Sequence, residues 1–317
     1  MDLSQRHRAM LLSVLDDRRF DPNEPRLPHG PGGGRWGSLG GIVGKIKHWH
    51  NDSSGVHDLA AAVESGETSR TKLSGGRMGT TELVVHRNGA KTVSKTFLDV
   101  SAQMGPGYEP ESQADAEQLS AVAGTKIGAP VARVLRTAPD AITTEFIEGE
   151  SAVEIRNKIR KEAKTVREEL DVPETAHAEI ARIAATPAGV RLGAFDILTG
   201  QWDRSNPANW MLTPAGAPVG IDHAFGFDDQ AAFPSEPPAR GLVGPFATQF
   251  VDYTSAPPRW ANNPLSQNDI AWLRKQLGEI EDDFTARKSH DWWEFMLERL
   301  DAIAPYASGT ESKFAPR

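Results

Sequence analysis

The stretch GQWDRSNPANWMLTPAGAPVGIDHAFGF, Gly200 to Phe227, places two carboxylates and an amide between apolar residues. Asn209 follows Asp203 by six positions, and Asp222 follows Asn209 by thirteen. Asp, Asn and Gly favour turns, so these residues can serve local backbone conformation alone. The alternative is that the three side chains converge on a metal-bound phosphate. The pattern of the preceding segments distinguishes the two interpretations.

Composition restricts the class of protein. The chain has 317 residues, of which 38% are hydrophobic and 25% charged, as in a globular protein of one or two domains. The net charge of −8 argues against nucleic acid or an anionic membrane surface as a general partner. The chain has no cysteine, which excludes disulfides, a thiolate nucleophile and a Cys-ligated zinc site. We therefore expect a cytoplasmic protein.

Two further observations concern targeting. The first twenty residues lack the apolar core of a signal peptide. No window of the sequence is long and apolar enough for a membrane helix, so we expect no transmembrane segment.

The first 51 residues differ in composition from the rest. Residues Leu3 to Leu15 carry apolar side chains on one side of a predicted short helix. Residues Asp21 to Gly41 are dense in Pro and Gly and contain few residues that can build a core. This segment is predicted to be an arm that is disordered, or ordered only against a partner.

Strand patterns begin near Arg70. Three β-prone runs cover residues 70–74, 81–87 and 90–100, and Asn88-Gly89 joins the last two as a hairpin signal. A helix is predicted from Ser112 to Ala123, ending at Gly124. Two more strands are predicted over residues 129–137 and 141–149. This part of the chain therefore predicts an antiparallel sheet with one helix.

Helical patterns dominate after residue 150. A charged helical region over 151–185 is predicted to break near Pro173, and the apolar helix 190–201 leads into the Asp203 stretch. Amphipathic helices are predicted over 265–284 and 291–304, the first opening with Ser266 and Asp269 as a capping box. The fold class is therefore predicted as α+β, with a sheet first and mainly helices after it.

This order of parts resembles the protein-kinase-like superfamily. The segments WDRSNPANWML and IDHAFGF are similar to the atypical branch of phosphatidylinositol 3- and 4-kinases, toxin-type bacterial kinases and aminoglycoside phosphotransferases, and closest to type II phosphatidylinositol 4-kinases. The resemblance covers roughly Arg70 to Phe227. It implies a two-lobed fold with an antiparallel-sheet N-lobe over 52–148, a mainly helical C-lobe over 149–305 and a tail over 306–317.

The resemblance also implies a nucleotide site in the N-lobe. The turn SGGRMGT would let main-chain amides approach the phosphates of ATP, since its glycines have no Cβ: Gly75, Gly76 and Gly79. Lys95 would contact the α- and β-phosphates, and Lys91 is an alternative on the same face of the strand. Glu117 would hold this lysine by an ion pair, with Glu111 as its alternative. The main chain of a hinge would contact adenine: Glu145, Phe146 and Ile147.

The implied C-lobe residues lie in the Asp203 stretch. Asp203 would be the catalytic carboxylate that accepts or orients the proton of the attacking hydroxyl. Asn209 and Asp222 would bind Mg²⁺ through oxygen atoms. The family usually places its Asn five positions after the catalytic Asp, so Asn206 remains an alternative to Asn209. His223 occupies the position that is usually Phe.

The expected function is that of an ATP-dependent kinase, moving the γ-phosphate to a hydroxyl of a protein, lipid or small molecule with Mg²⁺. One alternative is transfer of AMP on the same fold. Another is a catalytically inactive kinase-like protein of a phage particle, because DPNEPRLPHGPGGGRWGS resembles segments of phage head-associated proteins and secreted bacterial toxins. The arm would then attach the protein to a partner chain or particle.

Overall fold

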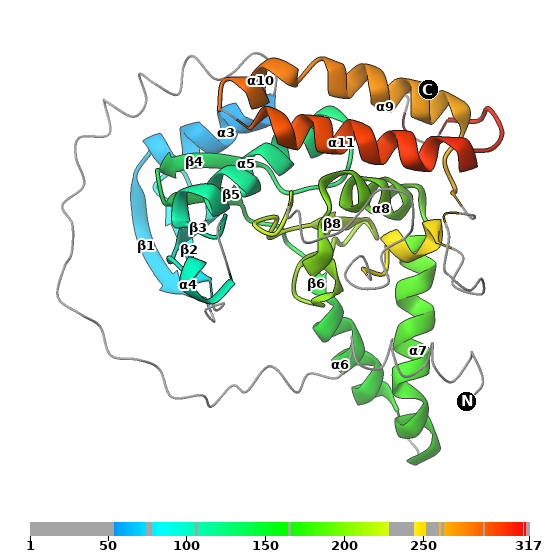
Figure 1. The fold of residues 1–317 in the computed structure, drawn as a ribbon. Coiled ribbons are helices and arrows are strands. Elements are labelled where there is room, and N and C mark those ends of the chain that lie inside the picture. The colour runs from blue at the N-terminus through cyan, green and yellow to red at the C-terminus, as the bar shows by residue number, and fades with distance from the viewer. Residues whose placement is uncertain are drawn as a thin grey trace.

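The computed structural model of the protein describes residues 54–73, 78–104, 107–163, 166–227, 244–251, 260, 263–287, 289–312 and 314. The predicted N-terminal helix and the Pro/Gly arm lie outside these residues, as do Gly75 and Gly76. The described residues form helices together with two antiparallel sheets, which is an α+β fold (Figure 1).

The larger sheet has five antiparallel strands in the order β1-β2-β3-β5-β4. Its strands are β1 (Glu67–Lys72), β2 (Gly79–His86), β3 (Lys91–Phe97), β4 (Val134–Ala138) and β5 (Ala141–Glu145). The predicted hairpin joins β2 and β3, and Gly89 takes the positive φ of 82° that this tight turn requires. The helices α3 (Ser54–Glu64) and α5 (Pro110–Lys126) pack against β3, β4 and β5, and the short α4 (Ser101–Met104) precedes α5.

Helix α5 is longer than the sequence indicates. It continues through Gly124 to Lys126, so the predicted end at Gly124 was wrong. Gly124 serves close packing instead, because a Cβ there would lie 2.4 Å from a methyl carbon of Val131. The chain leaves the helix at Gly128, which has a φ of 62°.

A three-stranded antiparallel sheet and a pair of helices follow the larger sheet. The strands are β6 (Glu150–Ser151), β7 (Trp210–Leu212) and β8 (Pro218–Gly220), and the helices are α6 (Ala152–Glu162) and α7 (Val166–Ala184). Helix α6 ends at Ala163, which is extended with a ψ of 124°. Pro173 lies inside α7, so the predicted break near Pro173 was wrong; its missing N–H removes one helical hydrogen bond without ending the helix.

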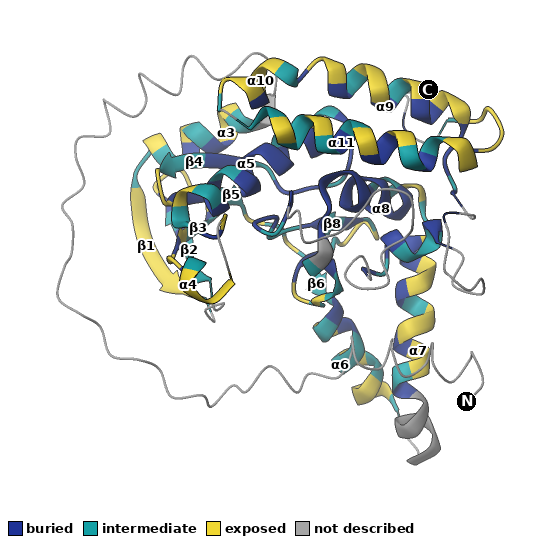
Figure 2. Ribbon diagram, in the orientation of Figure 1, coloured by how far each residue is buried: buried dark blue, intermediate teal, exposed yellow. Residues whose placement is uncertain are grey.

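The main core surrounds helix α8 (Pro187–Thr199), which is buried along most of its length (Figure 2). The C-terminal helices cover it: α9 (Gln267–Gly278), α10 (Glu281–Thr285) and α11 (His290–Ile303). Three 3₁₀ turns complete this part of the chain: η1 (Trp202–Ser205) after α8, η2 (Ala247–Phe250) before α9 and η3 (Ala304–Tyr306) after α11. The predicted capping box of Ser266 and Asp269 is confirmed. The predicted continuous helix over 265–284 was wrong, because the chain leaves the helix after Gly278 and Ile280 has a non-helical φ of −114°.

Helix α5 contributes to two hydrophobic clusters. Ala114 and Ala121 pack with Phe97, Val134 and Ile142 under the larger sheet. Other residues of α5, among them Ala116 and Leu119, belong to the main core around α8. The helix is therefore fixed from both sides, which matters because it carries Glu117.

Within the described residues, no helix combines the length and apolar character that crossing a membrane requires.

Two glycine substitutions test this packing. Gly193→Ala would place a Cβ 2.2 Å from the carbonyl oxygen of Phe246 at the buried α8 surface. We expect a loss of about 1–3 kcal/mol in unfolding free energy, which lowers the melting temperature by roughly 2–4 °C per kcal/mol. Gly278→Ala is the matched control, since a Cβ there meets nothing within 4 Å and Ala is the better helix former. Thermal denaturation in which Gly193→Ala is as stable as Gly278→Ala would contradict the packing.

Candidate functional site

Three charged residues predicted from the sequence meet between the larger sheet, α5 and the segment after β8. The Nζ of Lys95 on β3 lies 2.5 Å from Oδ1 of Asp222 and 3.9 Å from Oε2 of Glu117. Lys95 and Asp222 are 127 positions apart, so only the fold brings them together. The Glu117 side chain is 2% exposed, whereas that of Asp222 is 40% exposed.

The structure distinguishes Lys95 from its alternative Lys91, and Glu117 from its alternative Glu111. Lys91 is exposed, with its Nζ 5.5 Å from the ring centre of Phe146. Glu111 is exposed in the first turn of α5. Lys95 and Glu117 are therefore the pair that faces Asp222.

Burial dominates the electrostatics of this pair. Burial raises the pKa of Glu117 to about 7, although the charge of Lys95 opposes the shift. Burial alone lowers the pKa of Lys95, but the charges of Asp222 and Glu117 outweigh it and raise that pKa above its usual value. Lys95 is therefore a firmly charged ammonium group, held between two carboxyl groups.

The second half of the site is the loop that begins in η1. Asn209 donates from Nδ2 to Oδ2 of Asp203 at 2.7 Å and to the carbonyl oxygen of Asp203 at 3.0 Å. Asn206 is exposed, and its Oδ1 accepts from the N–H of Ala208 at 3.1 Å, closing a local turn. That turn accommodates the extra residue, so the six-position spacing places Asn209 beside Asp203 and leaves Asn206 outside.

Asp203 has the electrostatics of a proton acceptor. Burial and the negative charge of Asp222 raise the pKa of Asp203 to about 6, and the hydrogen bond from Asn209 partly offsets this. A carboxylate whose pKa lies near the working pH can take up and release a proton readily.

Asp222 has an unusual backbone. Its φ is 56°, in the left-handed region that residues other than Gly rarely adopt. The neighbouring backbone is fixed, because Gly220 donates to the carbonyl of Pro130 at 2.8 Å and accepts from the N–H of Ala132 at 2.9 Å. Gln201 donates from Nε2 to the carbonyl oxygen of Asp222 at 2.8 Å. Strained residues that the surroundings hold in this way concentrate at functional sites.

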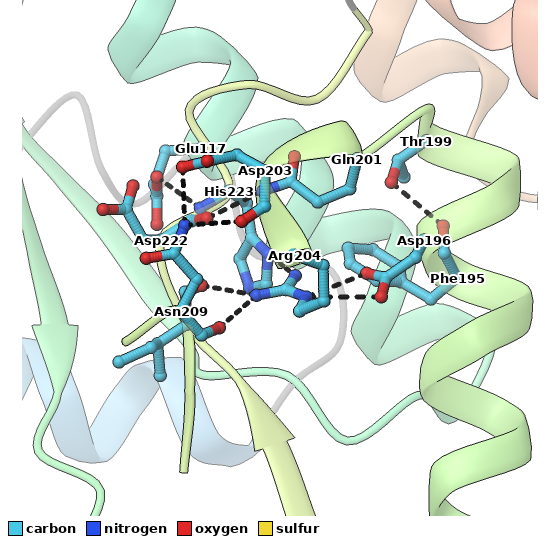
Figure 3. Close-up of polar contacts among 11 residues, drawn as sticks. Glu117, Phe195, Asp196, Thr199, Gln201, Asp203, Arg204, Asn209, Asp222 and His223 are labelled. Carbon is cyan, nitrogen blue, oxygen red and sulfur yellow. Dashed lines mark hydrogen bonds and ion pairs between the residues drawn. The ribbon is translucent and has the colours of Figure 1, made fainter. Parts of the chain in front are cut away.

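The buried charges beneath the site were not predicted from the sequence (Figure 3). Arg204 is fully buried, and its Nε lies 3.1 Å from Oδ1 of Asp196 on α8. Burial raises the pKa of Asp196 to about 6, against the charge of Arg204. His223 is also fully buried, and burial together with the charges of Arg204 and Lys95 keeps its pKa well below the usual value. An Asp within the apolar run AFDIL was the available signal for this pair.

The residues expected to contact adenine and phosphate take part in the local structure of the sheet. The N–H of Glu145 donates to the carbonyl of Arg133 at 3.1 Å, and its carboxylate pairs with the Arg133 guanidinium. Phe146 is exposed and Ile147 is half-buried, at the end of the strand whose Ile142 pairs with Lys95. A Cβ at Gly79 would lie 2.2 Å from the carbonyl oxygen of Thr96, so sheet packing alone requires glycine there.

Two oxygen donors of the site suit a hard cation. The N–H of Ile221 donates to the carbonyl of Asn209 at 3.0 Å, which places Asn209 beside the segment that carries Asp222. Within the part of the chain that the structure describes, no three His, Asp or Glu side chains form a metal-binding cluster. Mg²⁺ keeps several waters and takes phosphate oxygens, so the Asp222 carboxylate and the Asn209 amide oxygen fit it.

Comparisons with known proteins identify no family. No family model and no curated protein sequence match the chain. Among solved structures it is similar to Rv3197 from Mycobacterium tuberculosis, described in complex with erythromycin, with 17% identity and a TM-score of 0.32. The match covers 72% of this chain and 62% of that one, so the chain spans less than two thirds of that structure. A similarity this low supports no conclusion about activity.

The raised pKa of Asp203 predicts a stability gain on neutralisation. The ionised form is disfavoured in the folded state only, so wild-type stability falls as the pH rises from about 4 to about 6. Asp203→Asn should therefore raise the unfolding free energy at pH 8, by at most roughly 3 kcal/mol at about 1.4 kcal/mol per pKa unit. The gain should fade as the pH falls to about 4.

Denaturant titration without Mg²⁺ at several pH values measures this effect. Asp58→Asn, at an exposed position of α3, is the control, and we expect it to give no comparable gain in unfolding free energy at pH 8. Destabilisation of Asp203→Asn at pH 8 would contradict the buried, like-charged setting of Asp203.

Proposed function

We propose that this chain is a Mg²⁺-dependent phosphotransferase with a two-lobed kinase-like architecture, which moves the γ-phosphate of ATP to a hydroxyl group. The N-lobe would span residues 52–148 and the C-lobe residues 149–305. One observation carries the proposal: Lys95 lies between Glu117 and Asp222, next to a loop on which Asn209 binds Asp203.

Phosphoryl transfer needs chiefly positioning and neutralisation of charge. Lys95 supplies a cation, which Glu117 holds from the buried side while its opposite side faces the partly exposed Asp222. Phosphate oxygens of ATP that arrive at Asp222 would therefore meet the ammonium group of Lys95. Glu117 would keep that group in place, because α5 is fixed by two hydrophobic clusters.

Mg²⁺ held by Asp222 and Asn209 would neutralise the phosphate charge during transfer. Asp203 would orient the acceptor hydroxyl and take up its proton, for which a pKa of about 6 is suited. The hydrogen bond from Asn209 fixes the Asp203 carboxylate in one orientation. The two acidic residues would thus divide the work, with Asp222 at the nucleotide and Asp203 at the acceptor.

Nucleotide binding is the first test. A ligand at a hundredfold excess over its Kd stabilises the folded state by about 2.7 kcal/mol, which corresponds to roughly 5–10 °C in melting temperature. Mg·ATP should produce a shift of this order in the wild type and a much smaller one in Asp222→Ala. Asp58→Ala, on the exposed surface of α3, should retain the full shift. A wild type that shows no shift at millimolar ATP, roughly the upper range of KM values, would refute the proposal.

Transfer is the second test. We expect label from γ-³²P-ATP to appear on an acceptor, with protein, lipid and small-molecule hydroxyl compounds offered in turn. Asp203→Asn should lose this transfer by about 10²-fold or more while it keeps the Mg·ATP shift, because Asp203 acts on the acceptor proton. Label transferred from α-³²P-ATP instead would indicate AMP transfer. Mg·ATP binding without transfer of either label would indicate an inactive binding protein.

A further inference from the structure

Arg204 directly follows Asp203 and turns its guanidinium into the core. The Nη1 atom donates to the carbonyl oxygens of Asn209 and Ile221, the latter at 2.6 Å. The Nη2 atom lies 2.9 Å from Nδ1 of His223. One side chain therefore contacts the main chain of Asn209 and both neighbours of Asp222.

The anchor for this guanidinium is helix α8. The Nε atom donates to both carboxylate oxygens of Asp196, at 3.1 and 3.3 Å, and both side chains are fully buried. A buried arginine needs such an opposite charge. Since α8 forms the centre of the main core, the position of Arg204 is tied to the most deeply buried helix of the described residues.

The pocket around Arg204 is built to its shape. A Cβ at Gly244 would lie 2.8 Å from Cβ of Arg204, and one at Gly220 would lie 3.1 Å from its Nη2. Glycine at these two positions lets the backbone close directly on the side chain. The guanidinium is planar and offers donors in a fixed fork, whereas a lysine ammonium offers a single point of contact.

His223 extends the network to Glu117. Arginine only donates hydrogen bonds, so Nδ1 of His223 is the acceptor in this contact. The ring packs edge-on against Phe195 of α8, with centroids 5.2 Å apart. The N–H of His223 donates to Oε2 of Glu117 at 2.7 Å. Histidine at this position can accept from Arg204, which phenylalanine cannot.

We propose that Arg204 is a positioning residue that sets the spacing between Asp203, Asn209 and Asp222 by holding both segments against α8. The catalytic part of this inference rests on the proposed function, whereas the positioning of the two segments does not. Arg204 touches neither nucleotide nor acceptor in this scheme. It acts through the main chain of Asn209 and Ile221 and through the ring of His223.

The test compares two buried arginines in the full-length protein. Arg204→Lys removes the guanidinium fork beside Asp203. Arg299→Lys makes the same change in α11, where Nη1 of Arg299 donates to the carbonyl of Ile197 on α8. Both changes should lower the melting temperature. In Arg204→Lys, the exchange rate of backbone amide hydrogens should rise about tenfold or more in both segments, 203–211 and 219–227. In Arg299→Lys it should rise in neither segment.

Two further readouts separate positioning from general stability. The ¹⁵N spectrum of His223 should show a neutral ring with an accepting Nδ1 in the wild type and Arg299→Lys, and lose that signature in Arg204→Lys. In the phosphotransfer assay, Arg204→Lys should lower kcat by about 10²-fold, as a misplacement of about 1 Å can cause. Arg299→Lys should leave kcat unchanged.

The results of these experiments test the positioning role of Arg204 separately from the proposed function. The positioning role would be overturned if Arg204→Lys were destabilised as much as Arg299→Lys but kept wild-type hydrogen-exchange rates over both segments and the wild-type ¹⁵N spectrum of His223. If Arg204→Lys does not fold, Asp196→Asn replaces it, and unchanged exchange over both segments in that variant would overturn the role equally. A wild type without Mg·ATP binding would refute the proposed function, while exchange and the His223 signature would still decide the role of Arg204.

Discussion

The buried contact between Arg204 and Asp196 is the interaction on which the geometry of the site depends. Two charges in a core are stable only when they are paired and their remaining donors and acceptors are satisfied. Here the guanidinium uses its remaining donors on the carbonyls of Asn209 and Ile221 and on His223. The need to satisfy one buried cation thus draws two separate segments of the chain to α8.

The acidic groups in this contact and in the site above it are held at a cost to stability. Burial raises the pKa of Asp196 and Asp203 to about 6 and that of Glu117 to about 7, so each carboxylate is less favourable in the folded state than in the unfolded chain. Asp222 adds a left-handed backbone, with a φ of 56°. A chain selected for stability alone would not gather such groups, and their concentration in one place favours a functional site.

Sequence patterns predicted the structure correctly where the conformation depends on neighbouring residues alone. Asn88-Gly89 predicted the β2–β3 hairpin because both residues tolerate the backbone of a tight turn, and Ser266 with Asp269 predicted the start of α9. Gly124, contrary to the prediction, does not end α5 but allows close packing of Val131. Pro173 does not break the helical region, because it lies within α7. Contacts with distant residues overrode the local preference at Gly124.

The sequence by itself determined the α+β class, the succession of the strands of the larger sheet, and the residue types of the candidate site, because backbone propensity and the spacing of Asp203, Asn209 and Asp222 are properties of the linear chain. Only the tertiary structure shows that Lys95 and Glu117, and not Lys91 and Glu111, lie together beside Asp222. It also shows that Asn209, and not Asn206, bonds the carboxylate of Asp203. It alone revealed the pairing of Arg204 with Asp196. The physical reason is that burial and charge pairing arise between residues that are distant in sequence, and no local pattern records them.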